Sequence, residues 1–141
     1  MIKSRRPHFL LAVLLCLATV SPLSAEKKDF DARWREAELN VRSGAGQQYF
    51  NDVFVKEFFG KYAVHVTECT QRTGERIMTT LMAAVEVGAR GQVRAVMVRP
   101  RSKTSRCFAD LVKKDTFSPP PSDHFWIPVT VKFTSNDAVK Q

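Results

Sequence analysis

Residues 126–133 read Trp-Ile-Pro-Val-Thr-Val-Lys-Phe and alternate apolar and polar side chains more cleanly than any other part of the chain. Alternation with a period of two predicts a β-strand with one buried face. The predicted core face carries Ile127, Val129, Val131 and Phe133, and the other face carries Trp126, Pro128, Thr130 and Lys132. Because proline has no backbone N–H, Pro128 indicates an edge position in the sheet or the start of the strand.

The segments before this strand complete a module. Residues 77–87 predict a strand, and the two glycines in residues 88–91 predict a short hairpin to a partner strand at 92–98. The parity of the partner strand is ambiguous, which a β-bulge or burial of both faces would explain. Ser102 is a suitable N-cap for a helix over residues 103–114, which the Ser-Pro-Pro-Pro loop at 118–121 cannot continue.

These elements predict an α+β fold over residues 62–141, in which a small antiparallel sheet with β-β-α-β order packs on one helix. Residues 26–61 predict a helical lead-in with a second helix at 47–59, ended by Gly60 as a C-cap. Its aromatic face, which includes Tyr49 and Phe58, is typical of a core-facing surface, and a ligand groove is the alternative. Residues 62–67 alternate weakly and predict an extended arm or a short strand.

The first 25 residues resemble a secretion signal. Three basic residues precede an uncharged apolar run at 9–20, and small residues end at Ala25. Twelve apolar residues are short of the roughly 20 that span a bilayer, so we expect no stable transmembrane anchor. Lipidation at Cys16 is the alternative to cleavage near Ala25, although the bulky Leu15 before it disfavours this reading. The predicted location is the periplasm or the medium.

Removal of residues 1–25 would lower the net charge from +8 to +5 and leave Cys69 and Cys107 as the two cysteines. A pair of cysteines in an oxidising compartment predicts a disulfide bond, and two buried free thiols are the alternative. A redox-active pair would need C-x-x-C spacing or a neighbouring base, which this pair lacks in the sequence.

The sequence offers few groups for catalysis. His65 and His124 lack partners at metal-ligand spacing, and no nucleophile-elbow or phosphate-binding glycine motif occurs. We therefore expect a protein that is not an enzyme and that uses no cofactor or metal.

Residues 87–109 contain basic residues but no acidic one. The candidate basic patch consists of Arg94, Arg99, Arg101, Lys103 and Arg106. Such a cluster fits an anionic partner, and a solvated basic face is the alternative. Nucleic acid is not an expected partner, because the protein is expected to be exported and no aromatic residues interleave with the basic ones.

Residues 79–133 resemble the C-terminal domain of the TonB/TolA family of periplasmic proteins. The matching segments are residues 85–88 (Val-Glu-Val-Gly), 91–93 (Gly-Gln-Val), 96–98 (Val-Met-Val), the helix at 105–112, 117–120 (Phe-Ser-Pro-Pro) and 128–133 (Pro-Val-Thr-Val-Lys-Phe). The resemblance implies a small sheet packed on the helix, and a last strand whose exposed edge pairs with an extended segment of a partner. Full energy transducers of this family have an uncleaved membrane helix and a proline-rich spacer. The chain shows neither, so we expect a free-standing periplasmic version.

Two functions follow as hypotheses. The first is a non-catalytic binding or adaptor protein of the cell envelope, with Trp126, Pro128, Thr130 and Lys132 as the partner-binding edge. The second is an envelope enzyme or redox protein whose site would have to include His65, His124 or the cysteines.

Overall fold

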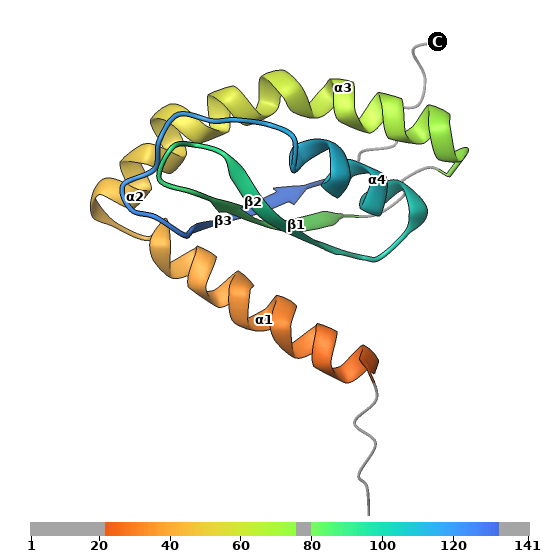
Figure 1. The fold of residues 1–141 in the computed structure, drawn as a ribbon, viewed down its shortest axis with the longest axis horizontal. Coiled ribbons are helices and arrows are strands. Elements are labelled where there is room, and N and C mark those ends of the chain that lie inside the picture. The colour runs from red at the N-terminus through yellow and green to blue at the C-terminus, as the bar shows by residue number, and fades with distance from the viewer. Residues whose placement is uncertain (1–21, 76–79, 133–141) are drawn as a thin grey trace, which may run out of the picture.

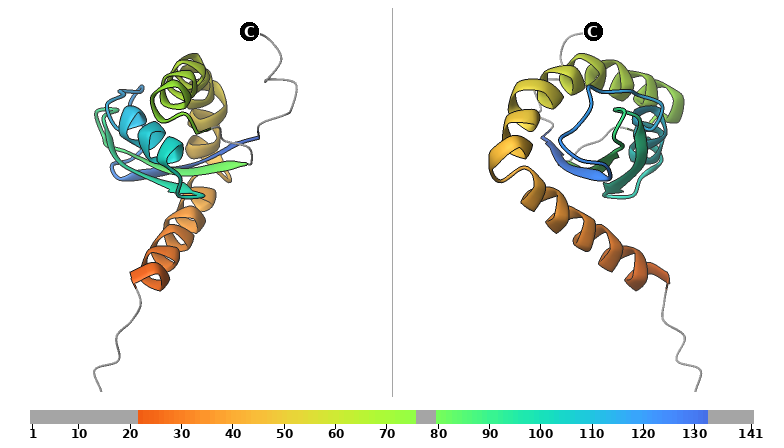
Figure 2. Two further views of the ribbon diagram at one scale, coloured as in Figure 1. Left: turned by 90° about the vertical axis from the view of Figure 1, so that its right-hand side faces the viewer. Right: turned by 60° about the vertical axis from the view of Figure 1, so that its left-hand side comes forward.

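The computed structural model of the protein describes residues 22–75 and 80–132. A three-stranded sheet forms the middle layer, with α3 and α4 over one face and α1 against the other (Figures 1 and 2). In chain order the elements are α1 (Pro22–Asn40), α2 (Gly44–Gln48), the π-helix η1 (Tyr49–Phe54), α3 (Val55–Thr73), β1 (Leu81–Val87), β2 (Val93–Arg99), α4 (Lys103–Val112) and β3 (Phe125–Val131). The predicted α+β class with an antiparallel sheet is confirmed.

The central strand is β1, which pairs antiparallel with β2 on one side and with β3 on the other. Val85 of β1 lies opposite Val96 and Ile127. The strand burial follows the apolar parity of the sequence, because Ile127, Val129 and Val131 all belong to the main core. The sequence also predicted strand structure at residues 77–79 and at Phe133. All of these residues lie outside the described part of the chain.

The hairpin between β1 and β2 confirms the predicted bulge. Glu86 pairs with Ala95 and the next residue, Val87, pairs with Val93, so Arg94 is the extra residue on β2. This shift reverses the parity within β2 and explains why its sequence pattern was ambiguous. Gly91 has a φ of +84°, which a residue with a side chain rarely adopts.

Helix α3 corrects two predictions about residues 60–67. Gly60 does not end the helix, and residues 62–67 form neither an extended arm nor a strand, because α3 continues to Thr73. The helix ends at Gly74, whose φ of +66° makes it the C-cap. Burial of Phe58 and Cys69 on one face outweighs the cost of about 1 kcal/mol for a glycine inside a helix. The predicted boundary between residues 61 and 62 falls inside α3.

The prediction that the sheet packs on one helix is also wrong, because helices cover both faces. Trp126, Ala84 and Ala37 of α1 form a second, smaller core on the face opposite α3 and α4. Helix α1 includes the first residues of the predicted helical lead-in, from Glu26 to Asn40.

Residues 1–21, with most of the predicted secretion signal, lie outside the described residues. Ala25, the predicted cleavage site, lies near the start of α1. Within residues 22–75 and 80–132, no helix has the length and apolar character needed to cross a membrane.

Candidate binding edge

Within residues 22–75 and 80–132, strand β3 pairs with β1 alone and is therefore an edge of the sheet, which is one of the two positions that Pro128 indicated. The backbone groups of successive residues in a strand point to opposite sides. The side-chain amide of Asn40 donates a hydrogen bond of 3.1 Å to the carbonyl oxygen of Trp126, so the Trp126 backbone faces the open side. By alternation, the backbones of Pro128 and Thr130 face the same side. The open edge therefore presents a carbonyl from Pro128 and both an N–H and a carbonyl from Thr130.

The structure separates the four predicted edge residues. The indole of Trp126 is only 6% exposed, packs against Ala37, and lies under the guanidinium of Arg33 at 5.3 Å from the ring centroid. Its side chain stabilises the packing of α1 and is not available to a partner. Pro128 is half-buried, whereas Thr130 and Lys132 are exposed. The usable edge is therefore shorter than the sequence suggested.

An apolar groove of about 60 Å³ runs beside this edge. Its lining residues are Phe50, Phe54, Val55, Phe58 and Phe59 from η1 and α3, and Pro128, Val129 and Thr130 from β3. The groove and the core share the aromatic face of the helices, and the core-facing interpretation of that face is confirmed by the burial of Tyr49, Phe54 and Phe58. Phe54 and Phe58 are buried in the core, whereas Phe59 is 57% exposed at the groove.

The aromatic face continues through the π-helix. The five-residue spacing from Tyr49 to Phe54 and the four-residue spacing from Phe54 to Phe58 keep these rings on one side, and all three are buried. The Phe54 and Phe58 rings stack with centroids 5.4 Å apart. The extra residue per turn of η1 thus aligns Tyr49 with the rings that follow it.

Partly buried polar contacts hold the proline loop against α3. The Glu57 carboxylate accepts hydrogen bonds from the backbone N–H of Ser118 at 2.8 Å and from its hydroxyl at 2.5 Å. The Tyr49 hydroxyl donates to the Ser118 carbonyl at 2.7 Å. Burial, together with the nearby Glu57 charge, raises the pKa of Tyr49 to about 12. These contacts fix the loop that leads into β3.

The predicted disulfide bond is confirmed. Cys69 on α3 and Cys107 on α4 are bonded, with their Cα atoms 5.6 Å apart. The bond joins the two helices that cover one face of the sheet.

Three of the five candidate basic-patch residues are in ion pairs. Arg94 binds Asp123 at 3.1 Å, Arg99 binds Asp31 at 2.9 Å, and Arg101 binds Glu26. Arg99 also lies over the Phe30 ring at 4.3 Å from its centroid. Two of the acidic partners come from α1, so much of the predicted patch holds α1 in place. Lys103 and Arg106 remain exposed on α4.

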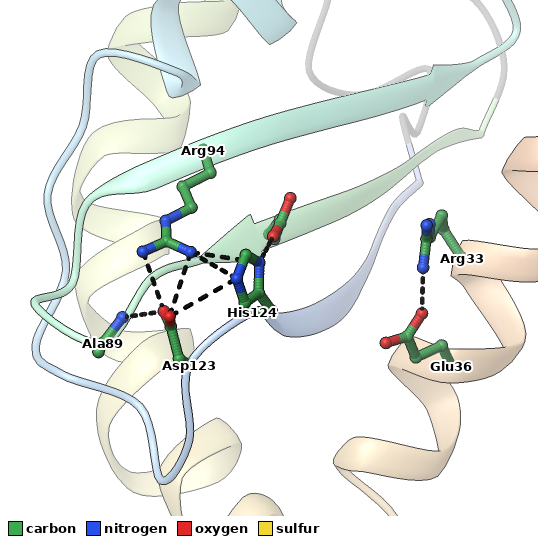
Figure 3. Close-up of polar contacts among 7 residues, drawn as sticks. Arg33, Glu36, Ala89, Arg94, Asp123 and His124 are labelled. Atoms are coloured by element: carbon green, nitrogen blue, oxygen red, sulfur yellow. Dashed lines mark hydrogen bonds and ion pairs between the residues drawn. The ribbon is translucent and has the colours of Figure 1, made fainter.

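The two histidines have acidic partners that the sequence did not reveal. His65 on α3 lies 2.8 Å from Asp115, which follows α4. Nδ1 of His124 lies 2.6 Å from Glu86 on β1, and the Arg94 guanidinium contacts both His124 and Asp123 (Figure 3).

The segment before β3 is tied to the hairpin by Asp123. The backbone N–H of Ala89 donates to its carboxylate at 2.8 Å, and this bond is the main cause that lowers the pKa of Asp123. Figure 3 shows the contact beside the Arg94 guanidinium. In the described part of the chain, no group of three or more histidine, cysteine or acidic side chains is arranged to hold a metal ion. The cluster around His124 connects the hairpin to the residue before β3.

Comparison of the chain with protein-family models, with curated proteins and with solved structures finds no match. The resemblance to the TonB/TolA C-terminal domain therefore stays a prediction from the sequence. The class that the fold defines is a small α+β domain with a disulfide bond and an open edge strand beside an apolar groove.

Proposed function

We propose that the protein is a non-catalytic binding or adaptor domain of the cell envelope, similar in its mode of action to the TonB C-terminal domain. It binds an extended segment of another envelope protein along β3, so that the segment becomes a fourth strand of the sheet. This mode, β-augmentation, takes its affinity from backbone hydrogen bonds and its selectivity from side-chain pockets.

The open edge of β3 carries this proposal. The outward backbone groups of Pro128 and Thr130, which pair with no other strand in the described part of the chain, form the template that a further strand needs. The apolar groove lies next to them. The export of the protein to the periplasm is part of the proposal and is supported by the signal-like residues 1–25 and by the disulfide bond.

Substitution of the residue that provides the outward N–H tests the proposal. Thr130→Pro removes that donor from an exposed position, and Thr130→Val is the matched control because it keeps the N–H and a β-branched shape. The mature chain and both variants would be used to capture partners from envelope extract, with circular dichroism to compare their folds.

Loss of one hydrogen bond of about 1 kcal/mol, together with the bulk of the proline ring at the edge, predicts a decrease in capture of at least about fivefold for Thr130→Pro. Thr130→Val should capture the same partner as the parent chain. Equal capture by the proline variant with an intact fold would refute docking at β3.

A further inference from the structure

The side chains of β3 point alternately to two faces of the sheet, and the two faces offer different surroundings to the side chains of a strand that docks beside β3. Val129 belongs to the core on the α3 side, whereas Pro128 and Thr130 project to the α1 side. In an added strand, the residue directly opposite Val129 has its side chain on the same face as Val129. That face holds the groove between β3 and α3. One side chain of the docked segment therefore points at the groove.

The groove suits an aliphatic side chain. None of its eight lining residues is charged, and five of them are apolar residues of η1 and α3. A water needs about 10–15 Å³ of such space, so a groove of about 60 Å³ takes about four heavy atoms, as in a Leu or Ile side chain. The exposed ring of Phe59 would lose water contact when this side chain docks.

Asn40 limits the length of the docking edge. Its amide occupies the outward carbonyl of Trp126, which a docked strand would otherwise use. A Cβ placed on Gly46 would lie 1.9 Å from the Asn40 carbonyl oxygen and 3.2 Å from the Phe125 ring, so α2 is packed closely against this end of β3. The pairing is thereby restricted to residues 128–132.

The other end of the edge carries a positive charge. Lys132 directly follows β3, is exposed, and stands two positions after Thr130, so a docked strand that continues past Thr130 would place a residue beside its side chain. Opposite charges directly across two strands stabilise the pair, by about 0.2–1 kcal/mol. An acidic residue in the docked segment is therefore favoured opposite Lys132.

We infer that the occupant of the β3 edge is an extended peptide segment that runs antiparallel to β3. From its N-terminus, the segment has an acidic residue, any residue, any residue except proline, a large aliphatic residue, and any residue except proline. The aliphatic residue lies opposite Val129 and enters the groove. The residues on either side of it donate their N–H groups to Thr130 and Pro128 and for this reason cannot be proline. This inference rests on the proposed function and adds the sequence pattern that the edge selects.

Three synthetic peptides test the pattern. The first is Gly-Asp-Ser-Thr-Leu-Thr-Gly with blocked ends, and the other two replace its leucine by aspartate or by glycine. Each would be titrated into the ¹⁵N-labelled mature chain, with amide chemical shifts as the measure of site and affinity. We expect the leucine peptide to shift the Thr130 amide and to bind at least tenfold more tightly than the aspartate peptide.

Variants assign the preference to the groove and the length limit to Asn40. Phe59→Ala should remove most of the preference for leucine, whereas Val64→Ala, at a 63% exposed position on α3 outside the groove, should leave it unchanged. Asn40→Ala frees the Trp126 carbonyl, so a peptide extended by two residues at its C-terminus should gain about fivefold in affinity only in this variant.

The outcomes separate the inference from the proposed function. Equal binding of the three peptides, with a shift at Thr130, would overturn the groove pattern and leave edge docking intact. Unchanged binding of the leucine peptide to Thr130→Pro would place it elsewhere on the protein and refute both. If no peptide shifts the Thr130 amide, both the pattern and the docking of short extended segments fail.

Discussion

Removal of the disulfide bond should cost a large part of the stability of this domain. The bond joins Cys69 to Cys107, which are 38 residues apart in the sequence. The chain-entropy relation assigns about 4 kcal/mol to closing a loop of this length in the unfolded chain. The total stability of a domain is about 5–15 kcal/mol, so the loss is a substantial fraction of it.

Urea unfolding of three samples measures this contribution. The samples are the oxidised mature chain, the same chain under reductant, and the Cys69→Ala/Cys107→Ala variant. With a urea dependence of about 2 kcal/mol per M, a loss of 4 kcal/mol lowers the midpoint by about 2 M. The thermal midpoint should fall by about 15 °C.

The reduced parent chain is the matched control, because it lacks the bond but keeps both sulfur atoms. Agreement between the reduced chain and the alanine variant would assign the loss to the bond itself and not to the small void left at buried Cys69. A reduced chain that unfolds at the same urea concentration as the oxidised chain would refute the entropic argument.

Three further predictions concern other parts of the fold. Gly91→Ala should destabilise the hairpin by at least 1–2 kcal/mol, measured by urea unfolding, since φ is +84° and a Cβ would lie 1.7 Å from the Phe117 carbonyl oxygen. The free energy of unfolding should decrease as the pH rises from about 10 to 12, because folding raises the pKa of Tyr49 from 10.0 to about 12 and the folded state resists ionisation. The Tyr49→Phe variant should show a weaker decrease between these pH values. Trp126→Ala should cost about 3–5 kcal/mol and make α1 a preferred site of limited proteolysis, whereas equal protection of α1 in both proteins would contradict the role of this indole.

Much of the local structure was predictable because it depends on neighbours in the sequence. Ser102 caps α4 as expected, and its side chain accepts a hydrogen bond from the backbone N–H of Ser105. The bulge at Arg94 was visible as a conflict of parity within one strand. Pro128 left two positions open, an edge of the sheet or the start of a strand, because a missing N–H is tolerated at both, and the structure shows the edge.

The length of α3 was not predictable from local signals. Gly60 looked like a stop, but the buried contacts of Phe58 and Cys69 with the rest of the core continue the helix to Gly74. A glycine inside a helix costs about 1 kcal/mol relative to alanine, and the burial of one large apolar side chain stabilises the fold by more than this cost. The sequence contains two glycines that could end the helix, Gly60 and Gly74, and the structure shows that Gly74 does.

The ion pairs show a second limit of prediction from the sequence. Residues 87–109 contain no acid, so their arginines looked like a free basic surface. Asp31 and Glu26 on α1 approach Arg99 and Arg101 from positions about 70 residues away in the chain. Charge patterns along the sequence cannot show such pairs, because only the packing of α1 brings them together.

The sequence by itself therefore determined the class of the fold, the strand faces, the disulfide pair and the edge character of β3, all of which follow from periodicity, backbone chemistry and cysteine number. The tertiary structure alone decided which of these features are accessible to a partner. Packing of α1 buries Trp126 and engages its carbonyl through Asn40, whereas α3 places Phe59 and the groove beside Thr130. Accessibility depends on contacts between segments that are distant in the chain, and no local pattern encodes it.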